Sequence, residues 1–149
     1  MGKVVVGLVD SMPPGSRTQI EVDRRAIVIF NVDGEFYALR DTCPHQGARL
    51  SQGTVVGSIT SPGPGRYEYD ATRKLVRCPW HGWEYELATG QSWFDPAHNR
   101  VRRYPVSVES GHVLSAREQD FEASGRSPGP YLAETFRISV QDDYVVVEI

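Results

Sequence analysis

Two short loops, in each of which a histidine closely follows a cysteine, constrain the fold of this chain more than any other feature. The first loop is Cys43-Pro44-His45, with Gly47 behind it, and the second is Cys78-Pro79-Trp80-His81, with Gly82 behind it. A thiolate and an imidazole two or three residues apart on a tight loop can point into one volume, and proline and glycine shape such loops. We therefore expect the two loops to converge and to supply four ligands to one metal centre.

The ligand types leave two kinds of metal centre open. A tetrahedral set of two sulfurs and two nitrogens suits either zinc or an iron-sulfur centre. Structural zinc sites commonly place two cysteines on one loop and two histidines on another, whereas each loop here carries one of each. A mixed loop suits a binuclear centre in which one metal takes both sulfurs and the other takes both nitrogens. A disulfide between Cys43 and Cys78, the only cysteines, also stays open, although the neighbouring histidines argue against it.

The composition is that of a water-soluble globular domain. The chain has 149 residues, of which 40% are hydrophobic and 23% are charged, and it needs no disulfide to bury a core. The formal net charge is −3 and the basic residues are scattered, so we expect no nucleic-acid partner. The apolar run from Val4 to Val9 is too short to span a membrane or to form a signal peptide. These features predict a cytoplasmic protein.

Short β-branched and aromatic segments bounded by turn residues predict an all-β fold, an antiparallel sandwich or partly open barrel, in a single domain over 1–149. Asp33-Gly34 is the strongest hairpin turn, and further turns are expected at Ala88-Thr89-Gly90 and Asp142-Asp143. Loops are expected at Ser11–Ser16, Ser61–Gly65 and Gly125–Pro130. The predicted strands are Lys3–Leu8, Gln19–Val22, Ala26–Asn31, Glu35–Leu39, Trp83–Leu87, Arg103–Val108 and Tyr144–Ile149.

The two loops resemble the signature of Rieske 2Fe-2S proteins, which is Cys-x-His followed later by Cys-x-x-His. Similarity to the Rieske ferredoxins of ring-hydroxylating oxygenase systems extends over nearly the whole chain, in Asp33-Gly34-Glu35-Phe36-Tyr37-Ala38, Cys43-Pro44-His45-Gln46-Gly47-Ala48, Cys78-Pro79-Trp80-His81-Gly82-Trp83 and Tyr104-Pro105-Val106. The resemblance implies one 2Fe-2S cluster, with Cys43 and Cys78 on the inner iron and His45 and His81 on the outer iron. It also implies a cluster-binding subdomain over approximately 41–93.

The resemblance further implies a low reduction potential. High-potential members of the family carry a disulfide between the cluster loops, and the matching positions here are Ala48 and Trp80. Their serine donor to a bridging sulfide is replaced by Trp83, although Tyr85 matches their tyrosine donor to a cysteine sulfur. Because fewer hydrogen bonds stabilise the reduced cluster, we expect a potential toward the low end of the Rieske range of about −150 to +300 mV.

The implied function is to pass single electrons from a flavin-type reductase to a terminal oxygenase. After Trp93 only His98 and His112 remain before Ile149, which leaves no room for the catalytic domain that holds the mononuclear iron of an oxygenase subunit. We therefore expect no substrate site, and these two histidines receive no role. Two alternatives are a zinc-binding interaction module and a small Rieske subunit bound permanently to a larger reductase or hydroxylase.

Three other features have competing interpretations. Trp80, Trp83, Trp93 and Phe94 could form a docking surface, but we favour packing around the cluster. Arg100, Arg102 and Arg103 could attract an acidic partner, but we favour a solvated strand end. The 32 residues between His45 and Cys78 exceed the usual ferredoxin spacing, which indicates an insertion that includes Ser58–Lys74, and a second excess lies at Ser115–Pro130.

Overall fold

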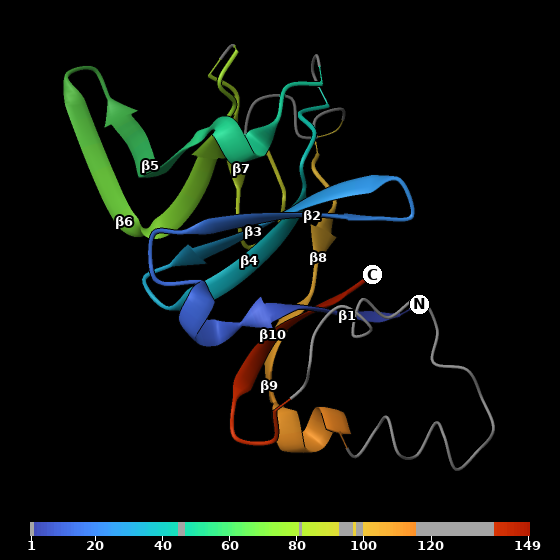
Figure 1. Ribbon diagram of the computed structural model, residues 1–149. Helices are drawn as coiled ribbons and strands as arrows, with labels where there is room; N and C mark the ends of the chain where they lie inside the picture. The colour runs from blue at the N-terminus through green and yellow to red at the C-terminus, as the bar shows by residue number, and fades with distance from the viewer. Residues whose placement is uncertain (1, 45–46, 81, 93–96, 98–99, 116–138) are drawn as a thin grey trace. The chain divides into compact units, whose positions relative to one another are not determined.

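A computed structural model describes residues 2–44, 47–80, 82–92, 97, 100–115 and 139–149. The described residues form antiparallel β-structure with two short 3-10 helices and one helical segment at 111–115 (Figure 1). No helix in these ranges is long and apolar enough to cross a membrane. The elements are β1 (Lys3–Leu8), η1 (Val9–Ser11), β2 (Arg17–Val22), β3 (Arg25–Val32), β4 (Glu35–Arg40), η2 (Leu50–Gln52), β5 (Thr54–Gly63), β6 (Arg66–Arg77), β7 (Glu84–Glu86), β8 (Arg103–Tyr104), β9 (Val106–Ser110) and β10 (Asp143–Glu148).

The chain divides into two compact units. The first contains Met1–Arg17, Phe30–Ala38 and Tyr104–Ile149, and the second contains Thr18–Ile29 and Leu39–Arg103. A three-stranded sheet of order β1-β10-β9 belongs to the first unit, and both of its strand pairs are antiparallel. Its valine-rich strands bury apolar side chains, and Val5, Leu114, Tyr144 and Val146 form one buried cluster.

A four-stranded sheet has the order β2-β3-β4-β8. Two-residue turns connect its first three strands, with positive φ at all four turn positions: Asp23 (49°), Arg24 (64°), Asp33 (54°) and Gly34 (92°). Such turns match the right-handed twist of paired strands, so the Asp33-Gly34 prediction is confirmed. The apolar run of β3 is almost wholly buried, and Ile27, Val28 and Ile29 expose none of their surface.

The third sheet has the order β5-β6-β7 and corrects the predicted loop at Ser61–Gly65. The region of the predicted insertion, Ser58–Lys74, lies in a long antiparallel hairpin in which β5 continues to Gly63 and β6 begins at Arg66 (Figure 1). The pairing becomes irregular between Gly57 and Ser58. Glycine, proline and charged residues obscure the period-two apolar pattern that would have revealed these strands.

The remaining predicted strands lie near their expected positions, with two corrections. Arg103–Val108 is not one strand, because Pro105 has no N–H to donate; β8 ends before it and β9 begins after it, in a different sheet. The last turn lies at 140–142, so β10 already begins at Asp143. The turn at residues 88–90 is confirmed, since Gly90 has φ of 76° and its N–H donates to the Glu86 carbonyl at 2.7 Å. The Gly125–Pro130 loop lies outside the described residues.

Candidate metal centre

Both cysteine side chains are buried within the second unit. Cys43 follows β4 and is 1% exposed, and Cys78 follows β6 and is 3% exposed. Neither cysteine is in a disulfide, so the bridge left open by the sequence does not form. A buried thiol behaves as a small apolar group unless a metal or a charge partner stabilises its thiolate.

Backbone hydrogen bonds close the first loop around its cysteine. The Cys43 N–H donates to the Ala48 carbonyl at 2.8 Å, and the Gly47 N–H donates back to the Cys43 carbonyl at 2.8 Å. Gly47 has φ of 80°, in the left-handed region where a Cβ atom is unfavourable. The glycine noted in the sequence is therefore the residue that lets the chain turn back.

The second loop repeats this arrangement. The Cys78 N–H donates to the Trp83 carbonyl at 2.6 Å, the Gly82 N–H donates to the Cys78 carbonyl at 3.0 Å, and Gly82 has φ of 71°. Each cysteine thus bonds to residues four and five positions further along the chain. The two cysteines are therefore held by equivalent backbone hydrogen bonds in the two loops.

The predicted imidazole ligands, His45 and His81, lie outside the described residues. In sequence they fall between the hydrogen-bonded ends of the two loops. The structure places both predicted cysteine ligands in buried, matched loops, and the assignment of all four ligands stays a prediction.

A tyrosine hydroxyl lies beside the first thiol. The Oη atom of Tyr85 on β7 is 3.3 Å from the Cys43 Sγ, and the Tyr85 side chain is fully buried. Burial raises the pKa of Tyr85, and the hydrogen bond with Cys43 raises it further. Tyr85 therefore stays protonated and can donate to a Cys43 thiolate, which confirms the predicted tyrosine–sulfur contact.

The positions that match the family disulfide differ in environment. Ala48 is 1% exposed, whereas Trp80 is 57% exposed. The prediction that Trp80 packs around the cluster is therefore wrong. Trp83 is half-buried, while Trp93 and Phe94 lie outside the described residues. Arg100, Arg102 and Arg103 are all exposed.

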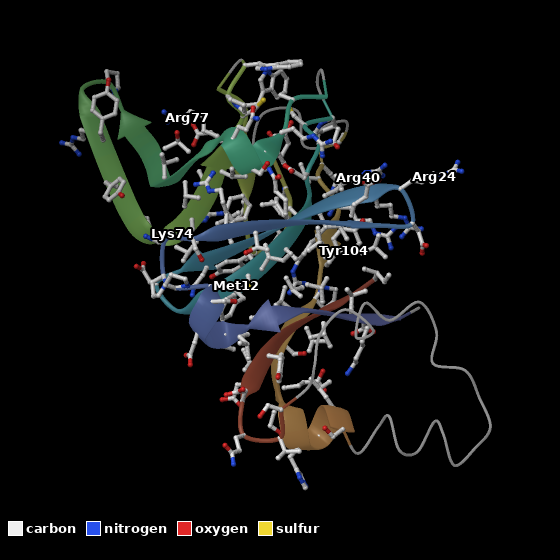
Figure 2. The ribbon with its side chains drawn as sticks, viewed as in Figure 1. Met12, Arg24, Arg40, Lys74, Arg77 and Tyr104 are labelled. Carbon is white, nitrogen blue, oxygen red and sulfur yellow. The ribbon has the colours of Figure 1, made fainter. Side chains whose placement is uncertain are left out.

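The segment that follows the first loop makes a close backbone contact with the strand that enters the second loop. A Cβ atom placed on Gly53, just after η2, would lie 2.2 Å from the backbone carbonyl oxygen of Arg77. Arg77, which is labelled in Figure 2, is the last residue of β6. It directly precedes Cys78 in the sequence. Only glycine lets the chain that follows the first loop approach the strand that enters the second, which is a role that the sequence did not reveal.

The donor set fits a metal cluster bound through sulfur. Two thiols with matched loop geometry supply soft ligands, the surrounding side chains exclude water, and Tyr85 offers a hydrogen bond that favours the charged form of sulfur. Residues 2–105 match the family model described as the Rieske [2Fe-2S] domain. The chain belongs to the Rieske family.

Relatives of this Rieske protein include ferredoxin components. The 3-phenylpropionate/cinnamic acid dioxygenase ferredoxin subunit of Escherichia coli (strain K12) is 34% identical over 76% of this chain and 92% of its own length. The ferredoxin of carbazole 1,9a-dioxygenase from Nocardioides aromaticivorans IC177 has a TM-score of 0.56 and 25% identity, covering 73% of this chain and 91% of that chain. A complex of reduced oxygenase and oxidised ferredoxin in carbazole 1,9a-dioxygenase matches with a TM-score of 0.53 and 25% identity, over 70% of this chain and 83% of that one.

Family membership establishes one Rieske-type 2Fe-2S cluster and an electron-transfer role. When bound, such a cluster supplies one-electron redox chemistry. The described residues of this Rieske protein hold two thiols in place, exclude water from them and direct one hydroxyl at a sulfur.

Proposed function

We propose that this Rieske protein accepts single electrons from a flavin-type reductase and delivers them to a terminal oxygenase in the cytoplasm. The observation that carries the proposal is the pair of equivalent loops that bury Cys43 and Cys78. The ferredoxin relatives named above belong to dioxygenase systems, and one matching structure is a complex of such a ferredoxin with its oxygenase. These relatives support an oxygenase as the electron acceptor, and the flavin-type reductase is proposed as the electron donor on the family resemblance.

The proposed ligands are Cys43 and Cys78 for the inner iron and His45 and His81 for the outer iron. Residues 1–149 form one Rieske domain, with the cluster-binding subdomain at approximately 41–93. Support comes from the sequence motif, the burial of both thiols and the hydrogen bond from Tyr85.

The ligand assignment is tested by replacing each histidine with alanine. His45→Ala and His81→Ala are expected to abolish or cripple the cluster, measured as bound iron, inorganic sulfide and the visible spectrum. His112→Ala is the matched control, because His112 is exposed and lies outside both motifs. Full iron content and an unchanged spectrum in His81→Ala would remove that residue from the ligand set.

The partner assignment is tested by mixing the reduced protein with an oxidised ring-hydroxylating oxygenase in a stopped-flow spectrometer. The expected result is reoxidation of the protein, with one electron delivered per cluster. Purification from the native host separates a mobile carrier from a permanent subunit. A carrier elutes alone, whereas constant stoichiometric association with one larger enzyme would contradict the proposal.

A further inference from the structure

We propose that the buried carboxylate of Asp41 positions the first ligand loop and lowers the reduction potential of the cluster. The proposal rests on the cluster that family membership establishes, and it does not depend on which reductase or oxygenase is the partner. Asp41 lies outside the Cys-His motif, and nothing in the sequence marks it as a functional residue.

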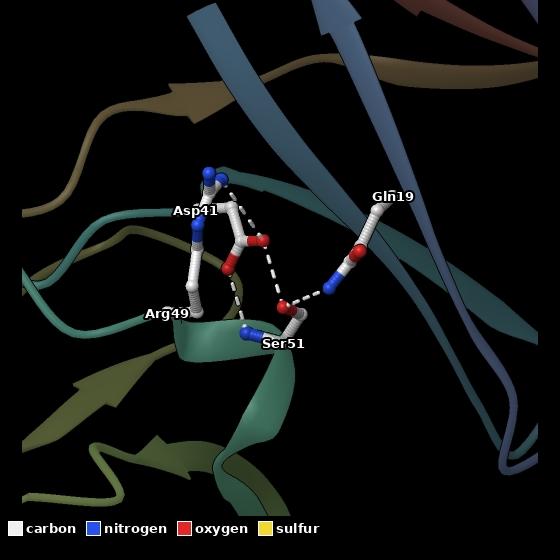
Figure 3. Close-up of polar contacts among 4 residues, drawn as sticks. All are labelled: Gln19, Asp41, Arg49 and Ser51. Carbon is white, nitrogen blue, oxygen red and sulfur yellow. Dashed lines mark hydrogen bonds and ion pairs between the residues drawn. The ribbon is translucent and has the colours of Figure 1, made fainter.

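Asp41 is anchored at both its backbone and its side chain. It follows β4, its side chain is fully buried, and its N–H donates to the Ala26 carbonyl at 2.8 Å. Its Oδ1 accepts the Ser51 backbone N–H at 2.7 Å, and its Oδ2 accepts the Ser51 hydroxyl at 2.7 Å (Figure 3). Ser51 belongs to η2, which comes directly after the first loop. The carboxylate therefore joins the two ends of the segment that carries Cys43.

The network continues to a strand and to one cation. Gln19 of β2 donates from Nε2 to the Ser51 hydroxyl oxygen, and the Arg49 guanidinium lies 3.9 Å from the Asp41 Oδ2 (Figure 3). The Arg49 side chain is 55% exposed, so water screens its charge, whereas the Asp41 side chain is 1% exposed. The compensation of the buried negative charge by Arg49 is therefore incomplete.

This charge acts on electron uptake because it lies close to a ligand. Residues two apart in a chain have Cα atoms within about 7 Å of each other, so the backbone positions of Asp41 and Cys43 are close. Reduction adds one electron, and hence one negative charge, to the cluster. Repulsion between the two negative charges is stronger in a buried environment than in water, so the Asp41 carboxylate disfavours reduction. The predicted low potential then has a second cause besides the small number of hydrogen bonds to sulfur.

The test is the potential of Asp41→Asn, measured by redox titration of the paramagnetic signal. Asparagine keeps the side-chain shape, and the Ser51 hydroxyl can rotate to accept from the new amide. The expected result is a full complement of iron and sulfide with a potential raised by about 59 mV, which is a tenfold change in the one-electron equilibrium. A fully loaded variant with an unchanged or lower potential would overturn the proposal.

Three further variants separate charge from structure. Glu21→Gln removes an equal charge from an exposed position on β2, and no shift is expected. Ser51→Ala keeps the Asp41 charge but removes the hydroxyl link, so the cluster should be lost faster on incubation with a chelator while the potential is not raised. An equal shift in Glu21→Gln would show that total charge, and not Asp41, sets the potential.

Arg49→Gln tests the same electrostatic effect with the opposite sign. Removing the cation leaves the buried carboxylate less compensated, so the potential should fall, by less than the rise in Asp41→Asn because Arg49 is exposed. If Asp41→Asn does not assemble the cluster, the potential of Arg49→Gln becomes the test of the charge effect. A lower potential in Arg49→Gln supports the charge effect, and an unchanged or higher one refutes it.

Discussion

Removal of the Tyr85 hydroxyl is expected to lower the reduction potential without loss of the cluster. Tyr85 is fully buried, and its only change in Tyr85→Phe is loss of the oxygen that lies 3.3 Å from the Cys43 Sγ. A hydrogen bond to a charged group contributes about 1.5–3 kcal/mol. Reduction increases the negative charge on the sulfur and strengthens this bond, so the hydroxyl favours the reduced form.

The size of the shift follows from the part of the bond that depends on the added electron. If that part is roughly 1 kcal/mol, the potential of Tyr85→Phe falls by roughly 40 mV for a one-electron couple. The assay is a redox titration followed by visible circular dichroism, with iron content measured on the same sample.

Tyr144→Phe is the control for this experiment. Tyr144 is also buried, and its hydroxyl oxygen accepts the Ser139 N–H at 2.8 Å, but it belongs to the first unit and not to the one that contains the cysteines. We expect its removal to lower stability and to leave the potential unchanged. A Tyr85→Phe protein with full iron and the wild-type potential would refute the role assigned to this hydroxyl.

Two further predictions concern stability. Gly53→Ala should destabilise the protein by about 1–3 kcal/mol in chemical denaturation and reduce cluster occupancy, because the new Cβ would meet the Arg77 carbonyl at 2.2 Å; Gly63→Ala, where a Cβ meets nothing within 4 Å, should do neither. The hydrogen bond from Tyr37 to Glu35 raises the pKa of Tyr37 from 10.0 to about 12. The stability that this hydrogen bond contributes is complete below pH 10 and is lost as the pH rises to about 12. Tyr37→Phe should therefore lose less free energy of unfolding than wild type over this pH range, with a difference of less than about 1 kcal/mol.

The sequence was most informative where structure and chemistry are local. The cysteine loops could be identified because their ligands, prolines and glycines lie within a few residues of each other, and the structure confirms the glycine turns at Gly47 and Gly82. Asp33-Gly34 was predictable for the same reason, because a two-residue turn with positive φ at both positions favours Asp-Gly.

Features that depend on residues far apart in the chain could not be predicted from the sequence. The β5–β6 hairpin is polar and glycine-rich, and its strands are defined by pairing with each other instead of by an apolar pattern. Asp41 looks like an ordinary acidic residue until its burial and its bonds to Ser51, ten positions away, are seen. The requirement for glycine at Gly53 likewise comes from the backbone at Arg77.

Electron paramagnetic resonance of the reduced, anaerobically purified protein tests the central claim most directly, together with iron and inorganic sulfide analysis of the same sample. We predict a coloured protein with two irons and two sulfides per chain and the anisotropic signal of a mixed sulfur- and nitrogen-ligated binuclear cluster. A colourless preparation with stoichiometric zinc, no sulfide and no signal on reduction would contradict the account.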